Sequence, residues 1–271
     1  MKWALKDNEK VEAKPKQKGL CPICNEEVIS KCGTIKIWYW SHKSNKDCDD
    51  WYEPETEWHI NWKNEFPKEC QEFTMGKHRA DIRTKERWII ELQNSSISSN
   101  EIQERENYYK RIIWLLNGET LCSGLDLREK NDIITFRWKN PPKSWWFANK
   151  EIYIDLSGII NKQKKKLKKY IDGDLIHRTP IYQQIEYEYY TPEAELIEVS
   201  YPKIVDYDDD TDLEIERINN KINLFENKIF LIKKIHSKIP CGGWGIILSK
   251  KEFLEKFKGR KKEDDTTTIK E

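Results

Sequence analysis

The sequence contains no long apolar run, no apolar segment near its start and no excess of either charge. No stretch approaches the length of a membrane-spanning helix, and the opening MKWALKDNEK lacks the apolar core of a secretory signal. We therefore expect a cytoplasmic protein with no membrane partner. Lysine plus arginine number 48 against 47 aspartate plus glutamate, a net charge of +1, so the charge of the whole chain argues neither for nor against a nucleic-acid partner.

Apolar residues are also scarce. The mean hydropathy is −0.87 and 35% of the residues are charged, values that favour disorder. Twelve tryptophans and twelve tyrosines oppose that interpretation, because disordered segments lack aromatic bulk. The 271 residues are enough for one or two domains with a real core, and we predict a folded, very polar protein.

Basic charge is concentrated in two short runs. KQKKKLKK occupies residues 162–169 and KGRKK occupies residues 258–262. Such runs are most often the solvated face of a helix. They are also the local surfaces at which this nearly neutral chain could bind a polyanion.

Cysteine is present but unevenly placed. Of the seven cysteines, Cys21, Cys24, Cys32 and Cys48 all lie before residue 50. In a reducing compartment such a group is expected to bind metal rather than to form disulfides. LCPIC places Cys21 and Cys24 at the C-x2-C spacing from which two thiolates reach one tetrahedral zinc ion.

The second pair of zinc ligands must come later in the chain. His42 and Cys48 complete the most regular set, and Cys32 in place of Cys48 is the alternative. The intervening ISKCGTIKIWYWSH predicts two strands joined by a turn at Gly33, which is the layout of a zinc ribbon. We therefore predict a zinc-ribbon-like module with a structural zinc ion, with small buried thiols as the alternative interpretation.

The segment after the cysteines predicts a regular series of helices and strands. Trp58, Trp62 and Phe66 recur at the spacing of one helix face, and Pro54 suits the first turn of that helix. Three short strands follow: CQEFTM, HRADIR and RWIIELQ. Ser98 then has the capping-box spacing of a second helix, and RIIWLL predicts a buried strand. The expected order is helix, three-stranded meander, helix, strand.

HRADIRTKERWIIELQ, residues 78–93, carries the most informative polar residues. Because side chains alternate along a strand, Glu91 and Gln93 share one face, and Asp81 on the neighbouring strand can lie beside Glu91. Two carboxylates held so close repel each other and are stable as ions only with a cation between them. Oxygen ligands of this kind suit Mg²⁺ or Mn²⁺. The hairpin is therefore a candidate metal site, and the alternative is an ordinary polar face.

These residues carry a family resemblance. The order of elements, with Asp81 and the sequence Glu91-Leu92-Gln93, resembles the PD-(D/E)XK nuclease core, with Gln93 where that core most often has lysine. More narrowly, CPIC, WSH, ETEWHINWK, HRADI, IELQNSSIS and ERENYY resemble the competence protein CoiA family of predicted nucleases. The resemblance covers roughly residues 18–120 and rests on the order and spacing of six motifs.

The resemblance implies metal-dependent hydrolysis of DNA phosphodiester bonds. It implies that Asp81 and Glu91 hold a Mg²⁺ or Mn²⁺ ion and that Gln93 orients water or a phosphate oxygen. It also implies that Glu57 completes the catalytic site from the preceding helix. Further residues expected to contact phosphate or to shape the cleft are His59, Lys63, Arg79, Ser95, Ser98 and Arg105. Single- or double-stranded DNA is the expected partner, in uptake, recombination or phage defence.

Gln93 is the departure from the common nuclease pattern. An amide cannot activate water as a lysine ammonium can, so either metal ions do that work or the activity is weakened. The alternative function is therefore a catalytically inactive, zinc-ribbon DNA-binding accessory protein built on a degenerate nuclease core.

The second half of the chain predicts fewer elements. A lysine-rich helix is expected over residues 158–170, and the tyrosine-rich, acidic stretch that follows predicts loop and linker. Between residues 213 and 239 apolar residues recur at every third or fourth position, which predicts a helix that packs on its own domain or forms a homodimer. The apolar positions are Ile215, Ile218, Ile222, Phe225, Ile229 and Ile232. PCGGWGIILSKKEFLEKF then predicts a glycine turn, a short strand and a helix capped by Ser249.

The overall prediction is a mixed α/β (α+β) protein. Its parts are a zinc-ribbon-like module at 1–52, a restriction-endonuclease-like core at 53–170, an acidic linker at 171–212, a C-terminal helical region at 213–258 and a disordered tail at 259–271.

Overall fold

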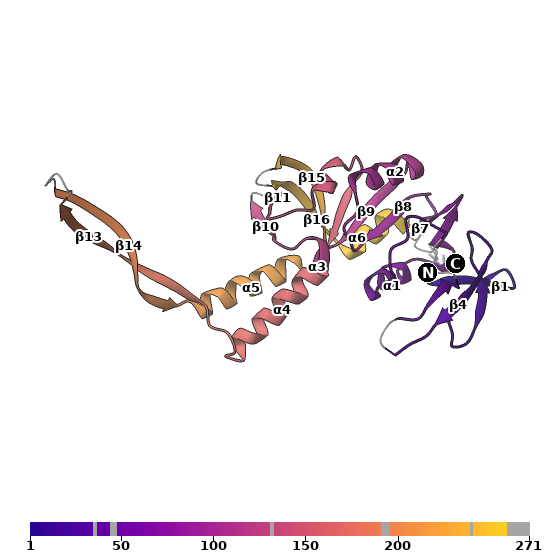
Figure 1. Ribbon diagram of the computed structural model, residues 1–271, viewed down its shortest axis with the longest axis horizontal. Coiled ribbons are helices and arrows are strands. Elements are labelled where there is room, and N and C mark those ends of the chain that lie inside the picture. Colours follow the sequence, from indigo (N-terminus) through magenta and orange to yellow (C-terminus); the bar gives the residue numbers. More distant parts are fainter. Residues whose placement is uncertain (35–36, 44–47, 131–132, 191–195, 239–240, 259–271) are drawn as a thin grey trace, which may run out of the picture. The chain divides into compact units, whose positions relative to one another are not determined.

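The computed structural model describes residues 1–34, 37–43, 48–130, 133–190, 196–238 and 241–258. The chain forms two compact units (Figure 1). The first takes residues 1–159 and the chain from residue 227 onward, and the second takes residues 160–226. The predicted disordered tail at 259–271 and all but Lys258 of the second basic run lie outside the described residues.

The N-terminal module is a five-stranded antiparallel sheet with the order β2-β1-β3-β4-β5. Its strands are β1 (Trp3–Lys6), β2 (Glu9–Glu12), β3 (Lys18–Leu20), β4 (Glu27–Lys31) and β5 (Tyr39–His42). Ala4, Val28 and Trp40 fill its core and are at most 1% exposed. The predicted pair of strands on either side of Gly33 is confirmed as β4 and β5. The three earlier strands were not predicted, because each has only three or four residues.

A nine-stranded mixed sheet forms the core of the first unit, in the order β10-β11-β16-β15-β12-β9-β8-β7-β6. Its strands are β6 (Gln71–Met75), β7 (His78–Arg83), β8 (Ile89–Gln93), β9 (Ile112–Asn117), β10 (Leu125–Lys130), β11 (Ile133–Trp138), β12 (Ile152–Asp155), β15 (Lys228–Lys238) and β16 (Cys241–Ser249). β8, β9 and β12 run parallel to one another. The predicted order of helix, three strands, helix and strand is present from α1 to β9.

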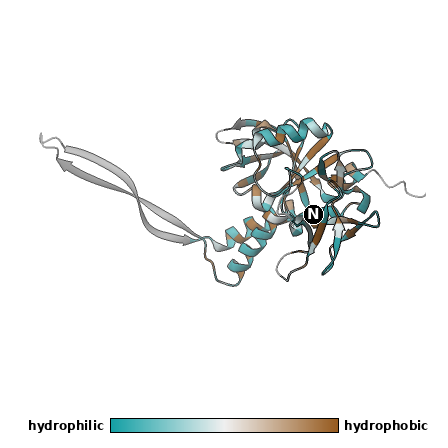
Figure 2. Ribbon diagram, turned by 45° about the vertical axis from the view of Figure 1, so that its right-hand side comes forward, coloured by the Kyte–Doolittle hydropathy of each residue, from teal (hydrophilic) through white to brown (hydrophobic). Residues whose placement is uncertain are grey.

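Helices cover both faces of this sheet. They are α1 (Glu57–Asn64), η1 (Lys68–Cys70), α2 (Ser99–Tyr109), α3 (Gly118–Leu121), η2 (Lys143–Phe147) and α6 (Lys250–Lys258). Ile113 and Leu115 of β9 pack in one cluster with Trp62 of α1 and Phe253 of α6, whose rings lie 5.6 Å apart. Trp114 points to the other face, where it contacts η2 and α2. Figure 2 shows hydrophobic residues concentrated on the strands between these helices.

The start of α1 is fixed by a capping box. Thr56 is the N-cap: its Oγ1 accepts a hydrogen bond from the His59 amide at 3.4 Å, and its own amide donates to His59 Nδ1 at 3.3 Å. The helix therefore begins at Glu57, and Pro54 lies in the extended segment before it rather than in its first turn. α2 begins after Ser98 as predicted, with Ser98 Oγ accepting from the Glu101 amide at 3.1 Å.

Along the sequence, the second unit lies between β12 and β15, two strands of the core sheet. It is built from α4 (Ser157–Ile171), β13 (Arg178–Tyr190), β14 (Leu196–Asp209) and α5 (Thr211–Phe225). β12 before it and β15 after it are antiparallel neighbours, with Asp155 paired to Ile229. β13 and β14 pair as a long hairpin, so the prediction of loop and linker over 171–212 was wrong. The alternation of tyrosine and glutamate at 186–190 has the period of a strand, which is the signal that was overlooked.

α5 ends at Phe225, so the prediction of a helix to residue 239 was wrong. Asn227 has φ of 54°, a left-handed conformation that ends helices and that asparagine adopts readily. Ile229 continues the helical spacing of apolar residues, but it also alternates with Leu231, and both are 1% exposed on β15. β15 and β16 belong to the core sheet, so residues 228–238 and 241–249 are strands rather than part of a helical region.

The remaining apolar stripe of α5 is buried within the single chain. Ile218, Ile222 and Phe225 are 2%, 7% and 5% exposed. The structure thus agrees with the alternative in which the helix packs on its own chain. The cap of α6 is confirmed, since Ser249 Oγ accepts from the Glu252 amide at 3.1 Å. Among the described residues, no helix combines the length and apolar character needed to cross a membrane.

Candidate active site

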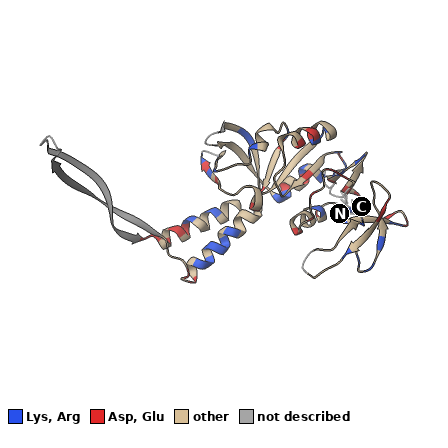
Figure 3. Ribbon diagram, in the orientation of Figure 1, with Lys and Arg blue, Asp and Glu red and all other residues tan. Residues whose placement is uncertain are grey.

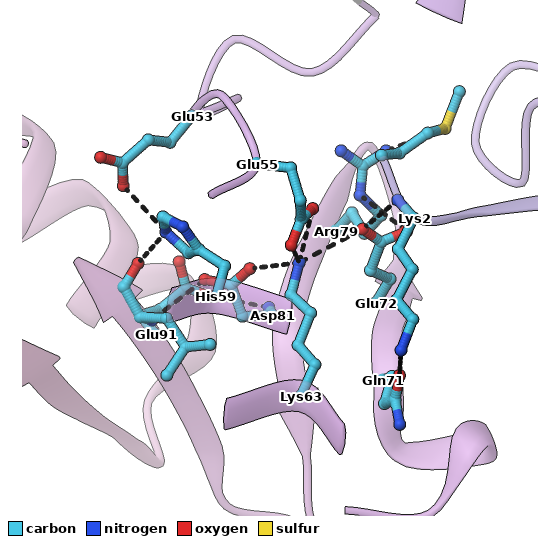
Figure 4. Close-up of polar contacts among 12 residues, drawn as sticks. Lys2, Glu53, Glu55, His59, Lys63, Gln71, Glu72, Arg79, Asp81 and Glu91 are labelled. Atoms are coloured by element: carbon cyan, nitrogen blue, oxygen red, sulfur yellow. Dashed lines mark hydrogen bonds and ion pairs between the residues drawn. The ribbon is translucent and has the colours of Figure 1, made fainter. Parts of the chain in front are cut away.

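Asp81 and Glu91 meet where two neighbouring strands part. β7 and β8 pair at Ile82–Ile90 and at Arg83–Ile89, and the ladder ends there. Just beyond it, Asp81 Oδ2 accepts a hydrogen bond from the Leu92 amide at 3.0 Å, and the Asp81 amide donates to Glu91 Oε1 at 3.4 Å. Figure 4 shows the two carboxylates together with the side chains around them.

The pocket at this point has an excess of acid. Five carboxylates line it: Asp49, Glu53, Glu55, Asp81 and Glu91. Its basic side chains are Lys63, Arg79 and Arg105, together with His59. Five negative charges against three positive ones leave a formal charge of −2 when His59 is neutral. One divalent cation carries the charge that balances it.

Lys63, in the last turn of α1, contacts three carboxylates. Its Nζ lies 2.9 and 3.0 Å from the two oxygens of Glu55, 3.1 Å from Asp81 Oδ1 and 3.2 Å from Glu72 Oε1. Burial would lower the pKa of this ammonium, but the carboxylates, Glu55 first, raise it above its usual value. Burial likewise opposes ionisation of Asp81, but Lys63, His59 and the Leu92 amide together outweigh it, so the pKa of Asp81 is lowered. Lys63 and Asp81 therefore form a charged pair.

Glu91 is paired with a different cation, Arg105 of α2. Arg105 of α2 donates from Nη1 to Glu91 Oε2 at 2.7 Å. Burial and the nearby charge of Asp81 raise the pKa of Glu91 to about 7, and Arg105 opposes that rise. The repulsion between the two carboxylates that the sequence predicts therefore contributes to the raised pKa of Glu91. Arg105 also donates from Nη2 to the carbonyl of Trp51 at 2.8 Å.

Gln93 lies behind the pocket rather than in its lining. It is 1% exposed, and its Nε2 donates to Glu53 Oε2 at 3.3 Å and to the carbonyl of Ser95 at 2.9 Å. This orientation leaves Gln93 Oε1 buried, and neither it nor the buried Glu53 Oε1 has a hydrogen-bond partner among the described residues. Buried oxygens are normally paired with a donor, a water or an ion. Both oxygens can therefore still accept a hydrogen bond or bind a cation.

His59 holds α1 against β8. Because its Nδ1 accepts from the Thr56 amide, Nε2 carries the ring proton, and Nε2 lies 3.2 Å from the carbonyl of Leu92 and 3.6 Å from Glu53 Oε2. Burial would lower the pKa of His59, but Glu53 and Asp81 raise it above its usual value. His59 is therefore a positioning residue for both Leu92 and Glu53.

The structure does not bring Glu57 into the pocket. Glu57 is exposed on the first turn of α1, whereas Glu55, two residues earlier, bonds Lys63. Sequence reasoning missed Glu53 and Glu55, because it placed Pro54 inside the helix. Recognising Thr56 as the N-cap would have put both glutamates in the extended segment that precedes α1.

The other predicted phosphate contacts are spread around the pocket. Arg79 lines it, and its Nε lies 3.9 Å from Glu72. Ser95 is exposed and contributes its carbonyl to Gln93, and Ser98 caps α2. Neither serine is in the pocket lining.

The predicted zinc ligands come together in the N-terminal module. One ligand atom from each of Cys21, Cys24, His42 and Cys48 lies within 4.8 Å of every other. The sulfurs of Cys21 and Cys48 are 3.6 Å apart, and Cys24 Sγ is 3.3 Å from His42 Nε2. A tetrahedral zinc ion with Zn–S bonds of about 2.3 Å needs sulfurs roughly 3.8 Å apart, so the donor set fits zinc. Cys32, the alternative ligand, is not part of the cluster.

Residues 48–53, the connecting segment, run from this metal cluster to the acidic pocket. Directly after Cys48, the carboxylate of Asp49 lies 2.8 Å from His78 Nδ1. The ring of Trp51 stacks on His78 with the centroids 3.3 Å apart. The segment ends at Glu53, one of the pocket carboxylates. A ligand of the candidate zinc site and part of the pocket wall are thus joined by a few residues with buried partners.

Glu72 of β6 links the N-terminal module to the same pocket. Its Oε1 accepts from the Lys2 amide at 2.7 Å and its Oε2 from the Trp3 amide at 3.1 Å. Burial opposes its ionisation, but Lys63 and Arg79 hold the pKa of Glu72 well below its usual value. The stability that ionised Glu72 contributes is therefore present above the unfolded-state pKa of about 4.3 and is lost as the pH falls below it.

We expect Glu72→Gln to lower the free energy of unfolding at pH 7 by about 3 kcal/mol, because it leaves buried cations without their partner. The difference from wild type should shrink as the pH falls below about 4.3, where the Glu72 carboxylate of the unfolded wild-type chain gains a proton before that of the folded protein does. Urea unfolding at a series of pH values measures this. Glu86→Gln, an exposed glutamate in the β7–β8 turn, is the control. A difference independent of pH would contradict the assignment.

Two family models match consecutive parts of the chain. Residues 56–151, which carry Asp81 and Glu91, match the nuclease-like domain of competence protein CoiA, so the first unit contains a nuclease-like domain. Residues 4–50, which carry the cysteine and histidine cluster, match the N-terminal domain of the same protein. The chain therefore belongs to the CoiA-like competence protein family, as its motifs indicate. No curated protein and no solved structure is similar enough to count as a match.

Proposed function

We propose that this protein is a divalent-metal-dependent deoxyribonuclease that hydrolyses DNA phosphodiester bonds. The observation that carries the proposal is the Asp81–Glu91 pair in a pocket lined by five carboxyl groups, at the point where β7 and β8 part. The nuclease-like domain supports nucleic acid as the substrate class. Cytoplasmic DNA handled in uptake, recombination or phage defence is the setting we propose.

The pocket fits a hard cation. Its donors are carboxylate oxygens, which Mg²⁺ and Mn²⁺ prefer, and Glu53 Oε1 is buried without a partner among the described residues. Asp81 and Glu91 would hold the ion, and Glu53 is a further carboxylate of the same pocket. Such an ion, when bound, polarises the phosphate and lowers the pKa of the attacking water.

The cations of the pocket have a second use in this proposal. Lys63 and Arg105 neutralise Asp81 and Glu91, and both line the space that a phosphate would enter. Lys63 then provides the ammonium that Gln93 cannot, from α1 rather than from β8. Arg105 presents a guanidinium, which can bind two phosphate oxygens at once. His59 keeps Leu92 and Glu53 in place around them.

The cysteine and histidine cluster is proposed as a structural zinc site. Its four ligands come from the loop after β3, the end of β5 and the start of the connecting segment. All four positions of a tetrahedral ion are then taken by protein atoms, which is typical of a structural site rather than a catalytic one. We also propose that the nuclease-like core leaves out residues 160–170 of the predicted range 53–170 and includes β15, β16 and α6, because these three elements complete its sheet and hydrophobic core.

A second candidate function is DNA binding without cleavage. The favouring observation is that Asp81 and Glu91 are already neutralised by Lys63 and Arg105, together with the amide of Gln93 where lysine is common. A chain of this kind would hold DNA as an accessory protein and would leave it intact.

Purified protein with its zinc retained should separate the two functions. We expect cleavage of linear, circular or single-stranded DNA when Mg²⁺ or Mn²⁺ is added, and none without a divalent ion. Cleavage of the circular form identifies an endonuclease. DNA binding with no cleavage in either metal would contradict the nuclease proposal and support the accessory function.

A further inference from the structure

The charged side chains of the helix α4 are all positive. Between Ser157 and Ile171 it has six lysines and no acidic residue. Figure 3 shows this run as the blue stretch of α4. Lysines spaced three and four residues apart repel one another along a helix. A helix with this sequence therefore needs negative charge from elsewhere.

Part of that charge comes from α5 and from Glu226, the residue directly after it. Lys164 forms an ion pair with Glu226, and Lys166 pairs with Glu214 at 2.8 Å. The apolar residues Ile160 and Tyr170 of α4 are buried, at 4% and 6% exposed. These contacts account for one side of the helix and for two of its six lysines.

The other lysines of α4 lie on a different side. At 3.6 residues per turn, Lys162, Lys165, Lys168 and Lys169 fall within an arc of about 120°. All four are exposed. Among the described residues, no ion pair is found for Lys165, Lys168 or Lys169. Lys168 and Lys169, in the last turn, interact favourably with the negative end of the helix dipole. That interaction does not extend to Lys165.

We propose that this lysine face of α4 binds the phosphate backbone of DNA. From Lys162 to Lys169 the helix rises roughly 10 Å. Successive phosphates of one DNA strand are about 3.4 Å apart along the helix axis, so this length matches about three phosphates. Lysine ammoniums on flexible stems are point charges, so they neutralise phosphates without reading the bases. The face is thus a sequence-independent holding site outside the acidic pocket. The choice of DNA among polyanions rests on the proposed function.

A salt-dependence measurement tests this inference in the full-length chain. The variant combines Lys165→Gln, Lys168→Gln and Lys169→Gln, in an Asp81→Ala background so that DNA stays intact. Fluorescence anisotropy with a short duplex of random sequence gives the affinity between about 50 and 200 mM salt. We expect affinity at the lowest salt to fall at least about tenfold and the slope of log K against log salt to fall by about 2.7, because each lost phosphate contact removes about 0.9.

Two further variants make the result specific. A matched control, Lys77→Gln with Lys85→Gln and Lys251→Gln, removes the same charge from three exposed positions of the first unit and should change the slope by less than about 1. Replacing the three α4 lysines by arginine should retain the wild-type slope, because arginine also neutralises phosphate. Equal slopes in the glutamine triple variant and the matched control would overturn the proposal. So would loss of binding to anionic lipid vesicles with DNA affinity unchanged.

The measurement is independent of catalysis. A wild-type chain that never cuts DNA refutes the nuclease function, yet the slope of the triple variant still tests the lysine face. Conversely, a wild-type chain that cuts DNA, with a triple variant of unchanged slope, refutes only the lysine face.

Discussion

Asp81→Ala should abolish metal-dependent DNA cleavage, with a rate loss of at least about 10³-fold, equal to roughly 4 kcal/mol of transition-state stabilisation. Asp81 is the less basic of the two central carboxyls, because Lys63 lowers its pKa against the effect of burial. Asp81 is therefore the more fully ionised of the two at neutral pH. The measurement is the single-turnover rate on duplex DNA in Mn²⁺ and in Mg²⁺.

The same substitution also disturbs the fold near the site. It removes the acceptor of the Leu92 amide and one partner of Lys63. Asp81→Asn is the gentler variant, because it keeps the shape and one carbonyl oxygen. Both variants should lose cleavage, and circular dichroism should show that both remain folded. A folded Asp81→Asn protein that cuts at the wild-type rate would contradict the catalytic assignment.

Glu55 and Glu57 offer a matched pair for the same assay. They lie two residues apart, but Glu55 bonds Lys63 in the pocket and Glu57 is exposed on α1. We expect Glu55→Gln to slow cleavage by about tenfold or more, through the altered position and charge balance of Lys63. Glu57→Gln should cut like wild type. The reverse order would restore the role that the family resemblance implies for Glu57.

Cys48→Ser should remove zinc and also loosen the acidic pocket. Cys48 contributes a thiolate to the four-residue cluster and begins the connecting segment that ends at Glu53. Because structural zinc contributes directly to folding free energy, the variant should contain less than about one tenth of the wild-type zinc and unfold at a markedly lower temperature. Metal analysis and thermal unfolding measure the two effects.

Cys32→Ser is the control for this prediction. Cys32 is the other candidate ligand in the sequence but lies outside the cluster, so its variant should retain zinc. Hydrogen exchange then adds a local readout: amides at 49–53 should exchange faster in Cys48→Ser and not in Cys32→Ser. Zinc retained in Cys48→Ser but lost from Cys32→Ser would reverse the ligand assignment.

Much of the nuclease-like core could be predicted because its signals are local. The alternation around Asp81, the apolar run of β8 and the serine cap of α2 each specify an element within a few residues. These elements also meet through short connections, so the neighbourhood of Asp81 and Glu91 follows from strand alternation and hairpin pairing. The cluster of Cys21, Cys24, His42 and Cys48 was predictable for a similar reason, since the C-x2-C spacing is one that suits two ligands of a tetrahedral ion.

The rest depends on contacts between distant residues. Glu72 gave no signal in its own strand, because its partners Lys2, Trp3 and Lys63 come from other elements. Ile229 fits both a helix and a strand pattern, and its pairing with Asp155 decides between them. Glu55 reaches the pocket because α1 begins after Thr56, whereas Pro54 alone suggests an earlier start of the helix. The pattern of residues in a short stretch of sequence does not show contacts with distant residues, nor which of two nearby positions begins a helix.

The adjacency of β12 and β15 makes the second unit removable. The chain leaves the core sheet at Asp155 and returns at Ile229, and these residues are direct neighbours across the two strands. A tight hairpin turn can join antiparallel neighbours, so a chain shortened by the whole of 160–226 keeps every strand of the nine-stranded sheet. Related chains could therefore gain, lose or exchange the second unit by insertion or deletion at a single point, without any change to the residues of the acidic pocket.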